Sequence, residues 1–170
     1  EEQIEDNNGI HSPEILPDIA TTECAETTQP EKSEESQTDK KHSILVIEDN
    51  EELLQSIRNL LATQFIVYTT TNGSEGINIA QSKNPELILS DIMMPGMNGF
   101  EVCRTIKQEI STSHIPVVLL SAKISDEDKL EGFQVSADAY ITKPFNFQLL
   151  KAQLLSIIEN RELTAQKFKN

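Results

Sequence analysis

The sequence predicts an α/β fold in which helices cover both faces of a five-stranded parallel sheet. Between residues 43 and 158, short apolar runs alternate five times with longer amphipathic stretches. Such alternation is typical of parallel strands joined by crossover helices. Right-handed crossovers leave two common doubly wound strand orders. Five strands fit the order 2-1-3-4-5, and no G-x-G-x-x-G follows the first run, which argues against the dinucleotide-binding order.

The predicted strands are short runs rich in Val, Ile and Leu. The first run, from Ile44 to Ile47, is apolar at every position, which suits a strand buried on both faces. The second run, from Phe65 to Thr70, is aromatic and β-branched. The five predicted strands are residues 44–47, 65–70, 87–90, 116–120 and 139–142.

The stretches that follow the strands carry apolar residues at helical spacing. The first and last have the strongest apolar stripes, whereas Gly73 and Gly76 weaken the second and the fourth has a poor stripe. The predicted helices are residues 50–61, 74–82, 100–108, 126–133 and 147–158. Strand and helix therefore alternate as in the flavodoxin-like, doubly wound arrangement.

Residues 1–42 differ in composition from the rest of the chain. They hold 12 acidic residues, three lysines and no aromatic residue, which is a net charge of −9 out of −14. Such a segment buries too little apolar surface to offset its chain entropy. We expect an acidic disordered linker or tail over 1–42 and a folded domain over 43–162. Residues 163–170 would be a helical extension or the start of a linker to a following domain.

The composition also bears on partners and compartment. A chain with a net charge of −14 gains nothing from neutralising nucleic-acid phosphates, so we expect no direct DNA binding. No apolar run approaches the roughly 20 residues of a membrane helix, and no signal peptide is present. The two cysteines, Cys24 and Cys103, indicate no disulfide framework. We therefore expect a reducing, cytoplasmic setting and no membrane contact by these residues.

Chemically active side chains follow the predicted strands at their carboxyl ends. Glu48 and Asp49 end the first strand, Asp91 the third, Ser121 the fourth and Lys143 the fifth. In an open parallel sheet, ligands bind at these ends, where the strand order reverses between the first and third strands. Each residue alone has a simpler explanation as a helix cap, a turn residue or a solvated charge. Their joint occurrence at one sheet edge predicts a functional site.

This set of side chains suits phosphoryl transfer. Clustered carboxylates repel one another, and Mg²⁺, which prefers oxygen ligands, relieves that repulsion. A carboxylate is a nucleophile toward phosphorus, and the transfer depends on positioning and on neutralising the phosphoryl oxygens. The cation and Lys143 would supply positive charge, and Ser121 would donate a hydrogen bond.

The residues around these positions resemble the receiver domains of response regulators over about residues 43–162. The resemblance rests on four segments: ILVIEDN at 44–50, LILSDIMMPGMNGFEVC at 87–103, IPVVLLSAK at 115–123 and ADAYITKPF at 137–145. It implies the phosphoacceptor domain of a two-component phosphorelay, which takes a phosphoryl group from a phosphohistidine and switches conformation. Such a domain catalyses only its own phosphorylation and dephosphorylation.

The resemblance implies a role for each residue at the strand ends. Asp91 would be phosphorylated, and Lys143 would contact the phosphoryl group. Ser121 and Tyr140 would form the switch pair, with the helix at about 126–133 moving alongside them. Mg²⁺ would be held by Asp49, Asp91 and the backbone carbonyl of Met93, with Glu48 acting through water.

Some local details also follow from the resemblance. It implies a cis Lys143–Pro144 bond, although X-Pro bonds in folded proteins are cis only about 5% of the time. Glu48 stands where many members have Asp, which keeps the charge. Ser136 stands where Gly is usual, which makes the end of the preceding helix less favourable. Met93 and Lys123 would flank the phosphate, and we expect the long apolar Met93 to hinder an attacking water and prolong the phosphorylated state.

Two other functions fit the sequence less well. A phosphatase of the haloacid dehalogenase type also uses an Asp nucleophile and Mg²⁺, but it carries D-x-D after its first strand. Here Asp91 follows the third strand and precedes Ile92 and Met93. A docking module that never accepts phosphate would not need the intact set of acids. Phosphorylation by acetyl phosphate with Mg²⁺ separates this second alternative from a working receiver.

The flanking segments resemble the surroundings of a receiver in a hybrid sensor kinase, and the chain begins with Glu1 rather than Met. The donor, a histidine kinase or phosphotransfer domain, would then lie on the same polypeptide. That parent protein would be a hybrid histidine kinase, a class that includes membrane-anchored proteins. A DNA-binding output domain would follow the receiver. A stand-alone regulator with an acidic tail is the alternative. A homodimer through the last strand and its flanking helices is a further expectation.

Overall fold

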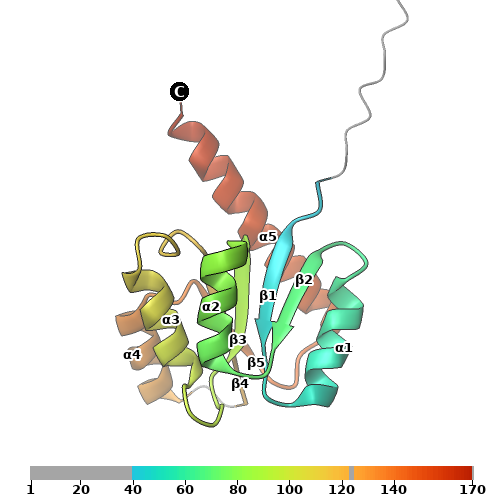
Figure 1. The fold of residues 1–170 in the computed structure, drawn as a ribbon, viewed down its shortest axis with the longest axis vertical. Helices are drawn as coiled ribbons and strands as arrows, with labels where there is room; N and C mark the ends of the chain where they lie inside the picture. The colour runs from blue at the N-terminus through green and yellow to red at the C-terminus, as the bar shows by residue number, and fades with distance from the viewer. Residues whose placement is uncertain (1–39, 123–124, 170) are drawn as a thin grey trace, which may run out of the picture. The chain divides into compact units, whose positions relative to one another are not determined.

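The structure is a computed structural model that describes residues 40–122 and 125–169. Two layers of helices enclose a central sheet (Figure 1). The strands are β1 (Ser43–Ile47), β2 (Ile66–Thr70), β3 (Leu87–Asp91), β4 (Val117–Ser121) and β5 (Ala139–Thr142). The helices are α1 (Glu51–Leu61), α2 (Gly73–Lys83), α3 (Gly99–Gln108), α4 (Asp126–Val135) and α5 (Phe147–Lys167). The predicted acidic tail, apart from its last three residues, and Cys24 lie outside the described residues.

The strand order is β2-β1-β3-β4-β5, and every neighbouring pair is parallel. This confirms the predicted fold and order. Nine of the ten elements end within two residues of their predicted bounds, and the exception is α5, which continues nine residues beyond residue 158. Neither Gly nor Pro follows Pro144, and residues 159–167 are mostly good helix formers, so nothing in the sequence ends the helix there.

The sheet separates two hydrophobic cores because successive side chains of a strand point to opposite faces. On one face, Ile44 and Val46 of β1 pack with the buried residues of α1 and α5. On the other, Leu45 and Ile47 pack with α2, α3 and the end of α4. All five residues of β3 are buried, so this central strand holds its last residue, Asp91, at a fixed place.

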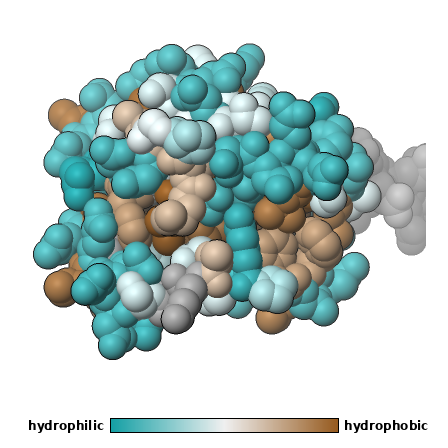
Figure 2. Space-filling view, turned by 90° about the horizontal axis from the view of Figure 1, so that it is seen from below, coloured by the Kyte–Doolittle hydropathy of each residue, from teal (hydrophilic) through white to brown (hydrophobic). Residues whose placement is uncertain are grey.

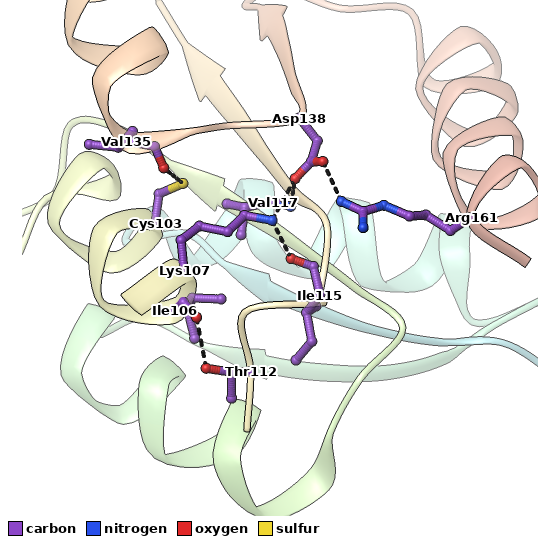
Figure 3. Close-up of polar contacts among 9 residues, drawn as sticks. All are labelled: Cys103, Ile106, Lys107, Thr112, Ile115, Val117, Val135, Asp138 and Arg161. Atoms are coloured by element: carbon purple, nitrogen blue, oxygen red, sulfur yellow. Dashed lines mark hydrogen bonds and ion pairs between the residues drawn. The ribbon is translucent and has the colours of Figure 1, made fainter. Parts of the chain in front are cut away.

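A polar network fastens the amino end of β4 to α3, α5 and the turn before β5 (Figure 3). Asp138 Oδ2 accepts hydrogen bonds from Lys107 Nζ at 2.9 Å and from the Val117 N–H at 2.8 Å. Asp138 Oδ1 accepts from the Arg161 guanidinium at 2.6 Å. Lys107 Nζ also donates to the Ile115 carbonyl at 2.8 Å. One carboxylate therefore holds two helices against the start of a buried strand.

The turn after α4 has the backbone conformation that the resemblance implied. Ser136 follows the last residue of α4 and has φ of +60°, in the left-handed region. A side chain in this region costs more than glycine does, so serine makes this helix end less favourable. Among residues 40–122 and 125–169, no helix combines the length and hydrophobicity that a membrane span requires.

Candidate functional site

The structure brings the five predicted side chains to the carboxyl end of the sheet. Glu48 and Asp49 follow β1, Asp91 ends β3, Ser121 ends β4 and Lys143 follows β5. Glu48, Asp91 and Ser121 are only 1%, 4% and 3% exposed, whereas Asp49 is exposed. Figure 2 looks at this end of the molecule, where hydrophilic residues surround smaller hydrophobic patches.

Lys143 lies at the centre of this cluster. Its Nζ atom is 2.8 Å from Glu48 Oε2 and 3.3 Å from Asp91 Oδ1. Its backbone N–H donates to the Ser121 carbonyl at 2.6 Å, so the ends of β4 and β5 are joined next to the carboxylates. The Lys143–Pro144 bond is cis, as the resemblance implied. One ammonium group therefore contacts carboxylates that come from two different strands.

The three acids of the cluster lie close enough to share a cation. Carboxylate oxygens of Glu48, Asp49 and Asp91 all lie within 4.8 Å of one another. Glu48 is further oriented by the Asn50 N–H, which donates to Glu48 Oε1 at 3.1 Å. A set of two or three carboxylates beside open solvent is the kind of donor set that Mg²⁺ prefers.

These acids are not needed to cap α1. The cap is Asn50, whose Oδ1 atom accepts a hydrogen bond from the Leu53 N–H at 2.9 Å. Asparagine is among the strongest N-cap residues, so the first turn of α1 is satisfied without Glu48 or Asp49. The side-chain cap is therefore Asn50, and the Glu48 and Asp49 carboxylates are not used for it.

The cluster has three carboxylates but only one ammonium group, that of Lys143, among its described residues. Burial raises the pKa of Glu48 and of Asp91 above their ordinary values, and this outweighs the opposing influence of Lys143. For Lys143, burial would lower the pKa, but the hydrogen bond to Glu48 and the charge of Asp91 more than offset it, so the pKa is raised. Lys143 therefore stays protonated, while the buried acids remain incompletely neutralised.

A glycine that the sequence argument did not single out shapes the loop beside Asp91. A Cβ atom on Gly99 would lie 2.8 Å from Ile92 Cα and would clash with the Asp91 carbonyl oxygen. The Gly99 N–H donates to the Ile92 carbonyl at 3.0 Å. Asn98 and Glu101 form a capping box directly around it. In the sequence, the signal for this close approach is a glycine directly after the N-cap residue Asn98, at the first position of α3.

Comparison with known protein families identifies this arrangement. Residues 44–155 match the model of the response regulator receiver domain. The chain belongs to the response regulator receiver family. Receivers are the phosphoacceptor domains of two-component signalling, so this function, which the resemblance implied, is confirmed. The family as a whole works with histidine kinases and output domains and generally binds Mg²⁺ at an acidic pocket.

Individual relatives include both kinases and regulators. "Histidine kinase P4" of Formosa agariphila is 38% identical over 172 residues, which cover 98% of this chain and 13% of that protein. The alkaline phosphatase synthesis transcriptional regulatory protein PhoP of Bacillus subtilis is 33% identical over 72% of this chain and 50% of the regulator. The chain therefore spans a small part of the kinase and half of the regulator.

Solved structures show the same receiver fold. The chemotaxis protein CheY4 of Vibrio cholerae is 29% identical, with a TM-score of 0.65, over 68% of this chain and 98% of that one. The receiver domain of a signal transduction histidine kinase from Syntrophus aciditrophicus is 28% identical, with a TM-score of 0.66, over 70% of this chain and 91% of that one. Receivers of regulators and of kinases are therefore both similar to this chain.

Tyr140, Met93 and Lys123 are the remaining residues that the sequence singled out. Tyr140, on β5, packs against the core beside α3, and its buried hydroxyl has no hydrogen-bond partner within the described part of the chain. Met93 follows β3 and is 73% exposed. Its N–H bonds to Asp91 and helps to lower the pKa of that acid, against the larger effect of burial. Lys123 lies outside the described residues.

Proposed function

We propose that Asp91 is the phosphoacceptor of this receiver and takes its phosphoryl group from a phosphohistidine. The observation that carries the proposal is the position of Lys143, whose ammonium lies 3.3 Å from Asp91 and 2.8 Å from Glu48. This protonated amine stands where it would neutralise phosphoryl oxygens bound to Asp91. Of the three acids, Asp91 is the one that belongs to the buried central strand β3, as its last residue.

The donor set fits Mg²⁺. Three carboxylates within 4.8 Å of one another provide oxygen ligands, and the raised pKa values of Glu48 and Asp91 show that more positive charge would be favourable. When bound, Mg²⁺ would add positive charge for the phosphoryl oxygens. We propose as its holders Asp49, Asp91 and the backbone carbonyl of Met93, with Glu48 acting through water.

The transfer itself needs a carboxylate, a neutralised phosphoryl group and a leaving imidazole. A carboxylate oxygen of Asp91 attacks phosphorus, the N–P bond of the phosphohistidine breaks, and the imidazole leaves with the electron pair and takes up a proton. Lys143 stays protonated throughout because its pKa is raised. The charge of Lys143 and the hydrogen bond from the Met93 N–H lower the pKa of Asp91 against the larger effect of burial, so both favour the carboxylate form that attacks phosphorus.

The switch would connect this chemistry to α4 and β5. The Ser121 hydroxyl would turn toward the new phosphoryl oxygens, and Tyr140 would move in the same direction. The Tyr140 hydroxyl has no hydrogen-bond partner among residues 40–122 and 125–169, which supports this step, because a buried hydroxyl favours any arrangement that supplies a partner. Leu130 and Phe133 of α4 are 62% and 83% exposed, so this helix is weakly anchored by its apolar residues. Phosphorylation would shift the balance between two existing conformations.

An apolar groove beside Lys143 suits the donor of the phosphoryl group. The groove has a volume of about 410 Å³ and is lined by Leu53, Lys143, Pro144, Phe145 and Phe147. The Phe145 and Phe147 rings meet edge to face, with centroids 5.5 Å apart. A histidine-bearing helix with apolar flanks would bury these rings and bring its phosphohistidine to the acid cluster. The donor would be a kinase or phosphotransfer domain, on the same polypeptide in a hybrid kinase.

The output side would be the edge formed by α4, β5 and α5. β5 is an edge strand, and Leu130, Phe133 and Leu149 are exposed on the helices beside it. We propose this surface for homodimerisation or for contact with an output domain. We propose a cytoplasmic location for this domain, which agrees with a free Cys103 and with a histidine kinase as donor. The parent protein would belong to a class that includes membrane-anchored kinases.

The test is phosphorylation of the whole chain by acetyl phosphate, read by mass spectrometry. With Mg²⁺, the parent chain should gain one phosphoryl group, and Asp91→Asn should gain none. Asp126→Asn is the matched control, because the Asp126 side chain is fully exposed. Equal modification of Asp91→Asn and the parent would refute the assignment. A chain that gains no phosphoryl group, with Mg²⁺ present and the fold intact, would instead be a docking module.

A further inference from the structure

A second cluster of metal-binding side chains lies at the amino end of the sheet, opposite the acids around Asp91. His42 precedes β1, Glu86 precedes β3, and Glu162 lies on the part of α5 that extends past the predicted end of the helix. Figure 1 shows that the start of β1 and the carboxyl end of α5 lie at the same end of the molecule. Ligand atoms of His42, Glu86 and Glu162 all lie within 4.8 Å of one another.

We propose that His42, Glu86 and Glu162 bind a divalent cation of the zinc class. His42 Nδ1 lies 2.7 Å from Glu86 Oε2 and 3.8 Å from Glu162 Oε1. Tetrahedral Zn²⁺ with ligand bonds of about 2.0–2.1 Å holds neighbouring ligand atoms roughly 3.3 Å apart, and these two distances bracket that value. Small side-chain rotations would therefore convert the present contacts into a coordination shell.

Among the described residues, no strongly placed protein cation neutralises this cluster. Lys40 Nζ reaches Glu86 Oε1 only at 4.0 Å, and its side chain is 86% exposed, so solvent screens this pair. Arg161 stands next to Glu162 in the sequence, but its guanidinium points to Asp138, 2.6 Å away (Figure 3). Two carboxylates thus face one imidazole that is neutral whenever it binds a metal.

The donor atoms distinguish this cluster from the acids around Asp91. One imidazole nitrogen and two carboxylates suit Zn²⁺, whereas Mg²⁺ prefers oxygen ligands alone. The cluster borders a groove of about 420 Å³ that Glu86, His114 and Glu162 all line. This groove leaves room for a water molecule as the fourth ligand.

Backbone contacts hold two of the ligands in place. Glu86 Oε2 accepts the Ser43 N–H at 3.3 Å, and the Glu86 N–H donates to the Ser43 carbonyl at 2.9 Å. The His42 carbonyl accepts the Ile66 N–H at 2.8 Å at the edge of the sheet. Supporting contacts of this kind orient metal ligands and raise affinity. A bound metal would tie the start of β1 to α5 and fix the direction of the helix beyond Glu162.

The experiment measures Zn²⁺ binding to the full chain by calorimetry and by thermal unfolding. Excess Mg²⁺ is present throughout to occupy the acids around Asp91. We expect one saturable Zn²⁺ per chain. Zn²⁺ should raise the unfolding temperature. His42→Gln, Glu86→Gln and Glu162→Gln should each raise the dissociation constant about tenfold or more.

Matched variants identify which residues bind. Glu159→Gln, an exposed acid one turn earlier on α5, should bind like the parent. Asp49→Asn and the double variant His11→Gln, Cys24→Ser should also bind normally. The proposal is overturned if no saturable binding occurs or if His42→Gln and Glu162→Gln both bind like the parent. It is also overturned if Asp49→Asn or the His11→Gln, Cys24→Ser double variant abolishes binding. Phosphorylation of Asp91 should persist in all three ligand variants, so this outcome is independent of the proposed function.

Discussion

The ammonium of Lys143 lies 3.3 Å from the carboxylate of Asp91, yet the pKa of Asp91 is still raised. Burial is the largest cause, and the neighbouring charge of Asp49 acts in the same direction. Lys143 divides its charge between Asp91 and the more deeply buried Glu48. The cluster is therefore less stable than one with balanced charges, which suits a site that takes up Mg²⁺ and a phosphoryl group.

Asp91→Asn should stabilise the metal-free fold at neutral pH. An acid whose folded pKa is raised contributes stability below its ordinary pKa of 3.8, and this contribution is lost as pH rises through the folded value. At pH 7 the charged Asp91 is therefore a cost, and its removal should add on the order of 1 kcal/mol to the free energy of unfolding. Urea unfolding from pH 4 to 7 measures this, and the difference should shrink toward pH 4.

The fully exposed Asp126 provides the control for this prediction. Asp126→Asn should change the free energy of unfolding by no more than about 0.5 kcal/mol at any pH. A stabilisation by Asp91→Asn that did not depend on pH would mean that the acid cluster is not its cause.

Ser121→Ala should separate phosphorylation from its consequence. The hydroxyl is not needed for the attack on phosphorus, so acetyl phosphate should still modify Asp91. The change in conformation should be largely lost, because the hydroxyl is the group that would follow the phosphoryl oxygens. Amide chemical shifts of α4 and β5, recorded with and without phosphorylation, measure the response. A full response in Ser121→Ala would contradict the proposed coupling, and Thr at this position should restore it.

Met93→Asn should shorten the life of the phosphorylated state. Met93 is 73% exposed beside Asp91, so its long side chain can hinder a water molecule that attacks the phosphoryl group. Asparagine is shorter and would instead orient water. The decay of phosphorylated protein after removal of acetyl phosphate gives the half-life, which we expect to fall several-fold. An unchanged half-life would eliminate this role, and Met93→Leu should behave like the parent.

Phe147→Ala should slow transfer from a protein donor while leaving modification by acetyl phosphate unaffected. Phe147 lines the groove beside Lys143 and contacts Phe145, but it does not contact the acids in any described interaction. Loss of its ring removes apolar contact area from the docking surface alone. Rates of transfer from a phosphorylated kinase or phosphotransfer domain should fall at least about tenfold. Phe168→Ala, another exposed ring on this chain, is the control.

Much of this architecture could be predicted from sequence because it depends on local patterns. Short apolar runs predict the five strands, and the polar residues that end these runs include Glu48, Asp49, Asp91, Ser121 and Lys143. The sequence alone does not show which residue caps α1, because Asp49 and Asn50 are both good N-cap residues. The structure shows that Asn50 is the cap.

Features that depend on distant contacts could not be predicted. The steric need for Gly99 appears only when α3 is placed against the end of β3. The sequence left open whether residues 163–170 continue the last helix or begin a linker, because the last turns of α5 carry few buried residues and the apolar stripe stops before the helix does. The grouping of His42, Glu86 and Glu162 joins residues up to 120 positions apart, and no local pattern announces it.

Asp138 should be the most important single acid for stability. Partial burial would raise its pKa, but the hydrogen bonds from Lys107 and from the Val117 N–H outweigh this and lower it. Its contribution to stability is therefore complete above the ordinary pKa of 3.8 and lost as pH falls through the lower folded value. Asp138→Ala leaves the buried Val117 N–H without its partner and should cost about 1–3 kcal/mol.

Ionisation of Asp138 stabilises the fold, whereas ionisation of Asp91 destabilises it, so the two acids should have opposite effects on the free energy of unfolding as pH changes. In urea unfolding, the deficit of Asp138→Ala should be constant from pH 7 to 5 and should shrink toward pH 3, because the parent itself then loses the interaction. Glu127→Ala, an exposed acid on α4, should show no deficit. Asp138→Asn keeps an acceptor for the Val117 N–H but no charge, so it should retain part of the stability and lose most of the pH dependence. An Asp138→Ala deficit that grew on acidification would mean that the Lys107 and Arg161 pairs do not stabilise this corner of the fold.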